Sequence, residues 1–261
     1  MFKRGLKLWS INFDCYSKDA QDFYEKGLYD YIELFAVPDS EDSIASWKKL
    51  KIPYIIHAPY FSLNFNLADN NNLETNLYIY RQVKYFADEL NAKYIIFHGG
   101  VDGNVEEVIR QLQTINDTRA IIENKPYVAY QNLGGDHRCI GYTPEEVQTI
   151  INTTGCGFCF DFGHAICSAN SQKLEVYNYC EQFNSLKPQM YHLTDVNDIT
   201  SPYDEHPHLG KGELDMLKIL NMIPDKSLVT IETEKKSSEN LSDFAEDMYY
   251  LQKHFEKHKK M

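Results

Sequence analysis

Eight short apolar runs alternate with longer amphipathic segments along this chain, and this alternation restricts its fold more than any other feature. The runs are rich in β-branched and aromatic residues and almost continuously apolar, as expected for strands buried on both faces of a parallel sheet. The predicted strands are Leu6–Trp9, Tyr31–Phe35, Tyr54–His57, Tyr94–His98, Ala120–Glu123, Phe158–Asp161, Met190–Leu193 and Leu228–Glu232.

The segments between these runs predict helices. Ser17–Gly27 begins with a serine cap and ends at glycine, and Asn72–Leu90 has apolar residues at helical spacing. A third segment opens with Thr143 as the cap, Pro144 at the first helical position and acidic residues in the first turn. The last helix is expected at about Ser238–His258.

The strand and helix count predicts a single α/β domain over residues 1–261, folded as a (β/α)₈ barrel, also called a TIM barrel. Eight strands with about eight helices in 261 residues fit the size of that fold. A doubly wound open sheet is the second choice of fold. No Gly-rich phosphate loop follows the first strand, which weakens a nucleotide-binding version of that fold. No linker, repeat or low-complexity segment divides the chain.

Six of the eight predicted strands end in, or carry near their end, a side chain that can bind a metal ion. Catalytic residues of barrel enzymes lie where strands end and loops begin. One such residue alone is usually solvated. Six at equivalent places would bring carboxylates and imidazoles together at one mouth. Bound cations would then offset both the repulsion between the carboxylates and the free-energy cost of burying them. The candidates are His57, His98, Glu123, Asp161, His192 and Glu232, with His164 three residues after Asp161.

The segment 204–212, in the long loop after the seventh strand, offers two further ligands, Asp204 and His206, flanked by proline and glycine. Mixed ligation by histidine and carboxylate suits Zn²⁺ or Mn²⁺ better than Ca²⁺, which takes oxygen ligands. We therefore expect divalent metal ions as cofactors, zinc first and manganese second.

The motifs HAPY, FHGG, IEN, DFGHA, YHLTD, DEHPHLGKG and IET follow one another in this order between about Ile52 and Glu234. The series resembles the xylose isomerase-like barrel superfamily, which includes sugar isomerases, sugar epimerases and the family-2 apurinic endonucleases of the endonuclease IV type. The endonuclease type implies three metal ions. Their ligand sets would be His57, His98 and Glu123; Glu123, Asp161, His192 and Glu232; and His164, Asp204 and His206.

The resemblance favours a metal-dependent phosphoester hydrolase. In such an enzyme Glu123 or Glu232 would help to orient the attacking water. Tyr60 matches a tyrosine that lies near the phosphate in the endonuclease type, and Asp195 and Lys211 are candidates for supporting the site or contacting a phosphate.

The alternative is a sugar or sugar-phosphate isomerase or epimerase, which the same resemblance implies would use one metal ion on the middle ligand set. Glu123 and Glu232 would then act as the acid and base at the substrate carbon. Aromatic residues near the mouth, such as Trp9, could stack on a small polyol. A barrel that binds a ligand without catalysis is a third hypothesis, and the density of ligand residues argues against it.

Charge argues for a small phosphorylated or sugar-like substrate and against nucleic acid. The net charge is −12, and the only basic run is the tail at residues 257–260. The segment after the second strand, 36–42, is acidic. At this place the DNA-repair enzymes of the superfamily carry a polar loop that contains Arg and Gln. A protein that binds a phosphate backbone should not line its groove with carboxylates. The first strand also lacks the family's usual histidine.

The remaining features bear on location and on the mouth of the barrel. No apolar window is long enough to span a membrane, and the N-terminus has no signal-peptide pattern, so we expect a cytoplasmic protein. Cys156 and Cys159 form a C-x-x-C pair, which we interpret as reduced core thiols because Cys159 lies in a predicted strand. The long segment Pro126–Gly141 is predicted to fold over the mouth and contribute to substrate choice.

Overall fold

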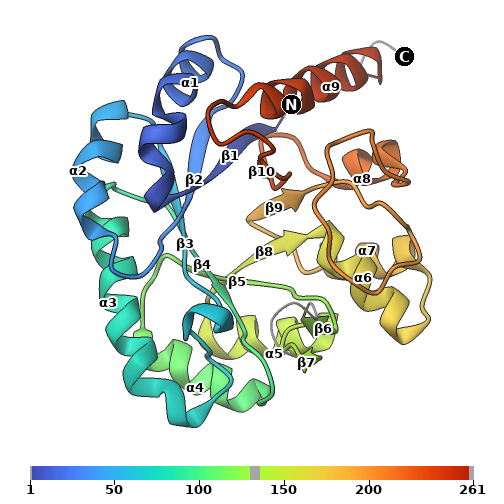
Figure 1. The fold of residues 1–261 in the computed structure, drawn as a ribbon. Helices are drawn as coiled ribbons and strands as arrows, with labels where there is room; N and C mark the ends of the chain where they lie inside the picture. The colour runs from blue at the N-terminus through green and yellow to red at the C-terminus, as the bar shows by residue number, and fades with distance from the viewer. Residues whose placement is uncertain (1, 130–135, 259–261) are drawn as a thin grey trace.

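The computed structural model describes residues 2–129 and 136–258, and within them eight parallel strands close into a barrel surrounded by helices (Figure 1). Around the barrel the strands follow the order β1, β2, β3, β4, β5, β8, β9, β10, so each strand pairs with its neighbours in the chain and β10 pairs with β1. This closure confirms the predicted (β/α)₈ barrel and excludes the open sheet. The barrel strands are β1 (Lys3–Trp9), β2 (Tyr31–Phe35), β3 (Tyr54–His57), β4 (Ile95–His98), β5 (Ala120–Glu123), β8 (Gly157–Asp161), β9 (Met190–Leu193) and β10 (Leu228–Ile231).

Helices cover the outside of the barrel. The α-helices are α1 (Phe13–Glu25), α2 (Ile44–Trp47), α3 (Leu73–Glu89), α4 (Val105–Ile115), α5 (Pro144–Thr154), α6 (Phe162–Gln172), α7 (Val176–Asn184), α8 (Met216–Met222) and α9 (Ser242–His258). Short 3₁₀ turns occupy Ser10–Asn12, Glu41–Ser43, Lys48–Leu50, Phe61–Leu63 and Asn70–Asn72. No helix within the described ranges combines the length and apolar character that a membrane span requires.

Two predicted helix starts differ from the structure. Helix α1 begins at Phe13, four residues before the predicted Ser17, because the 3₁₀ turn Ser10–Asn12 runs directly into it and Phe13 packs edge-on against Trp47 at 5.0 Å between ring centroids. Helix α9 begins at Ser242 rather than Ser238, since residues 238 and 239 form a bend and the backbone N–H of Leu241 donates to the side chain of Asp19 on α1 (2.9 Å).

The inside of the barrel is layered. Side chains alternate between the two faces of a strand, so residues two apart point the same way. One inward layer is apolar and consists of Tyr31, Ile55, Ile96, Ile121, Cys159 and Met190. Two residues further along the same strands the inward layer becomes polar, with Glu33, His57, His98, Glu123, Asp161 and His192. The apolar layer therefore closes one end of the barrel and supports a charged layer at the other.

Gly5 on β1 makes room for this apolar layer. A Cβ atom at Gly5 would lie 2.5 Å from the ring of Tyr31, which fills the interior at that level and whose hydroxyl is bonded to Thr230 (2.9 Å). Any larger residue at position 5 would displace the tyrosine and disturb the layer on which the polar residues rest.

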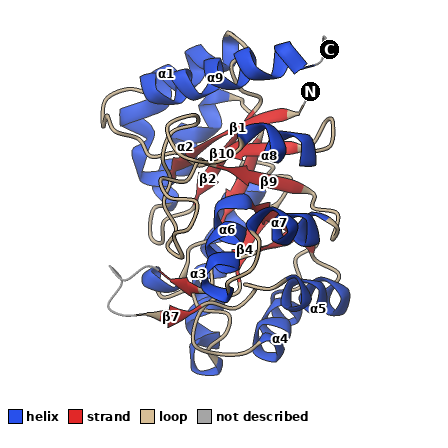
Figure 2. Cartoon of the chain, turned by 90° about the vertical axis from the view of Figure 1, so that its right-hand side faces the viewer, coloured by secondary structure: helices blue, strands red, loops and turns tan. Residues whose placement is uncertain are grey.

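Two further features lie outside the barrel wall. The strands β6 (Val128–Ala129) and β7 (His137–Arg138) pair antiparallel in a small hairpin that lies outside the barrel wall (Figure 2). The chain ends lie on the same side of the molecule, with α9 beside α1 in both views (Figures 1 and 2), and Tyr29 packs edge-on against Phe244 at 5.9 Å. The last helix thus seals the barrel next to the first.

Candidate metal centre

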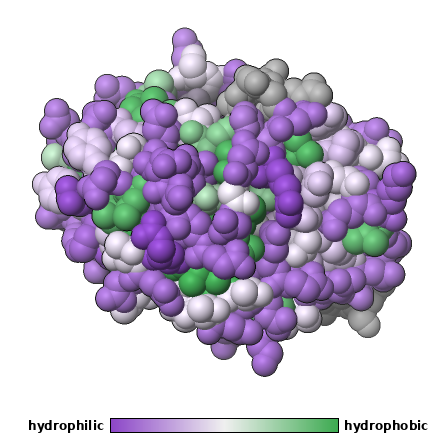
Figure 3. Space-filling view, turned by 90° about the horizontal axis from the view of Figure 1, so that it is seen from below, coloured by the Kyte–Doolittle hydropathy of each residue, from purple (hydrophilic) through white to green (hydrophobic). Residues whose placement is uncertain are grey.

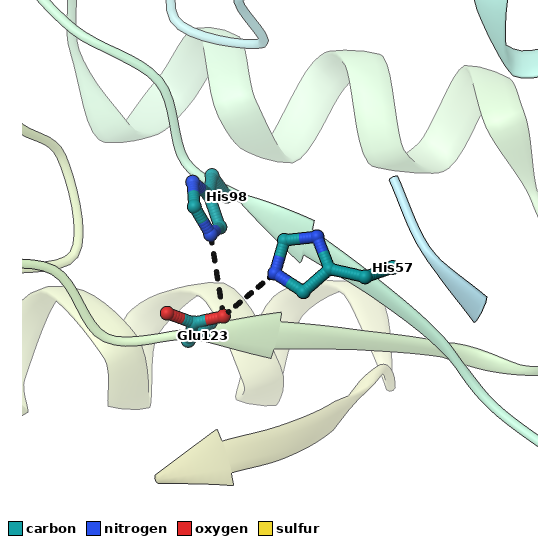
Figure 4. Close-up of side chains that lie close together, drawn as sticks. All are labelled: His57, His98 and Glu123. Carbon is teal, nitrogen blue, oxygen red and sulfur yellow. Dashed lines mark hydrogen bonds and ion pairs between the residues drawn. The ribbon is translucent and has the colours of Figure 1, made fainter. Parts of the chain in front are cut away.

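Glu123, at the end of β5, is the centre of the polar layer. Its Oε2 atom lies 3.2 Å from Nε2 of His57 and 3.2 Å from Nε2 of His98, and both imidazoles point toward this oxygen (Figure 4). The three side chains come from the strands β3, β4 and β5, which pair in this order, so that the ends of these strands lie side by side. They form the first ligand set expected from the sequence.

The second ligand set lies next to the first and shares Glu123. Nδ1 of His192 lies 3.1 Å from Oε1 of Glu232, 3.5 Å from Oε2 of Glu123 and 3.7 Å from Oδ2 of Asp161. Asp161 is also the N-cap of α6, because its Oδ1 accepts a hydrogen bond from the backbone N–H of His164 (2.7 Å). The cap uses one oxygen and leaves the other, Oδ2, near Nδ1 of His192 and Nδ1 of His164.

The third set joins α6 to the loop after β9. Nε2 of His164 lies 3.1 Å from Oδ2 of Asp204, and Nε2 of His206 lies 3.0 Å from the same oxygen. His164 reaches the first set as well, since its Nδ1 is 2.9 Å from Oε1 of Glu123. All nine residues proposed as ligands therefore form one continuous cluster.

The cluster fits divalent cations by its chemistry. Within the described residues, four of the buried atoms that lack a hydrogen-bond partner belong to it: Oδ2 of Asp161, Nδ1 of His192, Oδ1 of Asp204 and Nδ1 of His206. A buried polar atom without a partner costs free energy, so this concentration of such atoms indicates a missing partner of positive charge. Nitrogen and carboxylate donors together suit Zn²⁺ and Mn²⁺.

The surrounding charges keep the carboxylates ionised. Burial alone would raise the pKa of Glu123, but the positive charge of Lys125 and the contacts with the neighbouring histidines outweigh it and hold that pKa well below the usual range. For His98, burial and the nearby Lys125 lower the pKa to about 3, so its imidazole is neutral and able to bind a metal ion at physiological pH.

Two buried carboxylates fix the loop that carries Asp204 and His206. Asp195 accepts hydrogen bonds from the backbone N–H groups of Val196, Gly210, Gly212 and Leu214, at 2.8–3.1 Å. Asp247 on α9 binds Nδ1 of His208 and the backbone N–H of Leu209, each at 2.9 Å. Asp195 therefore supports the site by holding the loop in place, and its two oxygens are occupied by backbone donors rather than directed at a phosphate.

Two interior residues escaped sequence reasoning. Glu33 on β2 is fully buried, and its Oε2 lies 2.9 Å from Nε2 of His192 and accepts from the hydroxyl of Thr230 at 2.6 Å. The Nζ atom of Lys7 on β1 is 2.5 Å from both Glu33 and Glu232. Each lies two residues before the end of its strand, so the alternation of inward positions could have identified them where a search at strand ends did not.

Lys125 is a third residue that the sequence analysis missed. It follows Glu123 by two residues, and its Nζ lies 3.3 Å from Oε1 of Glu123 and 3.1 Å from Nε2 of His164. It therefore places a positive charge between the first and third ligand sets. The motif IEN ends one residue before it, which is why the motif did not point to it.

A cavity of about 550 Å³ opens above the cluster, and Trp9 and Tyr60 line it as expected. Trp9 stacks on Phe35 at 4.7 Å between ring centroids, and Tyr60 stacks on His98 at 5.8 Å. These rings form an aromatic wall beside the ligands. The predicted covering segment contributes Pro126, Ala129 and Cys139 to the cavity wall, and its residues 130–135 lie outside the described part of the chain.

Two sequence expectations about the cavity are not met. Lys211 is exposed and is absent from the cavity lining, because the turn that Asp195 organises directs this segment to the surface. The acidic segment after β2 does not line the cavity either, since Asp39 turns toward α3 and its backbone N–H donates to the side chain of Gln82 (2.8 Å). In the C-x-x-C pair, Cys159 is buried, Cys156 is half-buried and both are free thiols.

Known proteins with similar sequences and structures share this fold. A probable endonuclease 4 of Aquifex aeolicus is 26% identical, over 91% of this chain and 88% of its own length. A probable endonuclease 4 of Mycobacterium marinum is 28% identical, over 70% of this chain and 73% of its own length.

Two solved structures match nearly the whole barrel. A D-tagatose 3-epimerase-like protein superposes with a TM-score of 0.72 at 18% identity, covering 98% of this chain and 97% of that one. Endonuclease IV from Thermus thermophilus superposes with a TM-score of 0.69 at 16% identity, covering 98% of this chain and 99% of that one. Relatives and neighbours of these kinds indicate an enzyme. A family model described as the xylose isomerase-like TIM barrel matches residues 24–254, and the chain belongs to that family.

Proposed function

We propose that this protein is a divalent-metal-dependent hydrolase of phosphoesters. One observation carries the proposal: Oδ2 of Asp204 lies 3.1 Å from Nε2 of His164 and 3.0 Å from Nε2 of His206, so these three side chains can serve as a third ligand set. An isomerase that uses one metal ion needs only the middle set, so the additional ligands favour a multi-metal site. The relatives named probable endonuclease 4 support the same reaction class.

The chemistry is the addition of water across a phosphorus–oxygen bond: the water oxygen bonds to phosphorus, the ester bond breaks, and a proton passes to the leaving alcohol. Bound divalent cations would acidify the water and neutralise charge on the phosphate oxygens. Glu123 and Glu232 would help to orient the attacking water, since both carboxylates lie within 3.5 Å of Nδ1 of His192 and therefore close to each other. Lys7 and Lys125 fix these carboxylates in place.

The substrate that we propose is small and phosphorylated or sugar-like. The cavity of about 550 Å³ has the size of a site for a small ligand. The face drawn in Figure 3 is mostly hydrophilic, and apolar residues appear on it only in separate small patches. With a net charge of −12, this chain offers little attraction to a nucleic-acid backbone.

Metal content per chain tests the proposal directly. Protein purified without chelator should hold about three equivalents of metal, falling to about two in Asp204→Ala/His206→Ala, as expected when one of three separate ligand sets is removed. Glu205→Ala is the matched control, because Glu205 lies between these two ligands but binds Asn197 instead. The metal-loaded protein should hydrolyse small phosphomonoesters faster than DNA containing an abasic site.

An epimerase or isomerase is the second candidate, and the aromatic wall formed by Trp9, Phe35 and Tyr60 favours it because such rings stack on sugars. Glu123 and Glu232 would then exchange the proton at the substrate carbon. In that case about one equivalent of metal would be bound. This metal would remain bound in Asp204→Ala/His206→Ala and be lost in Asp161→Ala. Turnover would then be seen with sugars instead of phosphoesters. No metal retained and none taken up from Zn²⁺ or Mn²⁺ would rule out both functions.

A further inference from the structure

Lys235, in the segment between β10 and α9, lines the cavity together with the metal-ligand cluster. Its Nζ donates a hydrogen bond to the backbone carbonyl of Thr233 (2.6 Å) and lies 5.9 Å from the centre of the Phe244 ring. Among the described residues it has no carboxylate within ion-pairing distance, whereas the other two cavity lysines, Lys7 and Lys125, are each paired with glutamate. Lys235 is thus a cavity cation without a carboxylate in direct contact among the described residues.

The carboxylates nearest to Lys235 are already bonded to other donors. Asp243 accepts from the backbone N–H of Lys236 (2.8 Å), and Asp247 accepts from His208 and Thr233. Glu232 is bonded to Lys7 (2.5 Å). Glu234 also lines the cavity but is exposed, so water screens its charge. An anion from outside is therefore the partner that this ammonium group lacks.

The segment around Lys235 is held firmly. Tyr16 on α1 donates its hydroxyl hydrogen to the carbonyl of Ser237 (2.8 Å), and the backbone N–H of Glu234 donates to the carbonyl of His206 (3.0 Å). The second bond joins the segment to the loop that carries the third ligand set. A cation fixed in this way is preorganised for binding, because little conformational entropy is lost when a ligand arrives.

Partial burial makes the lack of a partner costly. Burial lowers the pKa of Lys235 to about 8, because the carboxylates of Asp243, Asp247 and Glu232 replace only part of the lost hydration. A desolvated ammonium group gains more from a bound anion than an exposed one does. Without a bound anion, the buried charge of Lys235 lowers the stability of the folded protein. A residue that costs stability but can bind a ligand is typical of a binding site.

We infer that Lys235 forms a second anchoring point in the cavity, which binds an anionic group of the substrate away from the metal centre. This inference rests on the proposed function, in which the metal centre holds the reacting phosphoester. The substrate class that follows is a small molecule with two separated polar ends: a phosphoester at the metals and a phosphate or carboxylate at Lys235.

Binding of paired probes to the metal-loaded protein tests this inference. Alkylphosphonates resist phosphoester hydrolysis and occupy the metal end. Matching compounds of increasing chain length carry a second phosphonate, a carboxylate or a neutral hydroxyl at the far end. By calorimetry, an anionic far end of suitable length should increase affinity about tenfold or more over the hydroxyl compound, as for a charge-assisted hydrogen bond. The better of the two anions identifies the natural group.

The increase in affinity caused by the anionic far end should disappear in Lys235→Met and persist in part in Lys235→Arg. It should remain in full in Lys236→Met, which changes the exposed neighbouring lysine. Urea unfolding should show that Lys235→Met is no less stable than the parent, because the substitution removes a desolvated charge. An increase that survives Lys235→Met, or no increase at any chain length, would overturn the inference. If no phosphoester is hydrolysed but the Lys235-dependent increase persists, the proposed reaction fails and the anion site stands.

Discussion

Glu33 shows how one buried residue can orient a candidate metal ligand. Its carboxylate lies 2.9 Å from Nε2 of His192, so the other ring nitrogen, Nδ1, faces Asp161 and Glu232. A carboxylate behind a ligand histidine fixes the tautomer and the ring orientation and increases the basicity of the ligand nitrogen. Lys7 compensates the charge of Glu33, which allows a carboxylate to be fully buried at this level.

Glu33→Gln should therefore weaken metal binding at the middle ligand set by about 10- to 100-fold, because the amide carries no charge to support the imidazole. Competition with a chromophoric chelator measures this affinity. Glu234→Gln is the control, since Glu234 is an exposed glutamate of the same cavity. Unchanged affinity in Glu33→Gln would mean that Glu33 only fills space in the barrel.

In the proposed metal site, the loop after β9 is the element whose conformation decides how many metal ions can be held. It has no helix or strand between Leu193 and Met216, and its shape depends on Asp195 and Asp247, which bind its backbone and His208. A loop without regular structure keeps one conformation only when its backbone groups find partners, and these two carboxylates provide them.

Asp195→Asn should loosen this loop and reduce metal content by about one equivalent while the barrel stays folded. The asparagine amide offers one acceptor oxygen instead of two, so backbone N–H groups lose their partners at a cost of about 1–3 kcal/mol each. Elemental analysis and hydrogen exchange over residues 204–214 measure both effects. Asp198→Asn, in the same loop but exposed and with a side chain that accepts from Thr200, should change neither. Full metal content in Asp195→Asn would contradict this role.

At the scale of the whole molecule, the barrel concentrates charge at one end and apolar packing at the other. Among the described residues, five buried or half-buried carboxylates share this end with three lysines and five histidines; the carboxylates are Glu33, Glu123, Asp161, Asp204 and Glu232. Without cations the histidines supply part of the missing positive charge. Burial opposes protonation of His164 and His206, but Asp161 and Asp204 raise the pKa of His164 to about 10, and Asp204 raises that of His206 to about 9.

Metal uptake should therefore release protons. Both raised pKa values lie above neutrality, so His164 and His206 are protonated at pH 7 in metal-free protein and must lose their protons to bind a metal ion. The affinity of the third ligand set should rise as pH increases toward these values. Calorimetry in buffers of different ionisation enthalpy counts the protons, about two for this set. Uptake of the full metal content without proton release would show that the two histidines are not ligands.

Sequence alone determined the fold and which residues are the main candidate ligands. Buried parallel strands are nearly continuous apolar runs, and their lengths and spacing reveal the barrel. Because barrel strands all point the same way, polar residues at strand ends such as His57, Glu123 and Glu232 must meet at one mouth, so local pattern was enough to group them.

Only the tertiary structure decided the contacts that depend on barrel closure and loop conformation. Lys7 and Glu232 are 225 residues apart in the sequence and meet because β1 pairs with β10. Lys211 turns to the surface and Lys235 to the cavity, although both are lysines in loops beside the ligands. The physical reason is that a loop side chain points where the hydrogen bonds of its backbone direct it, and those partners come from distant parts of the chain.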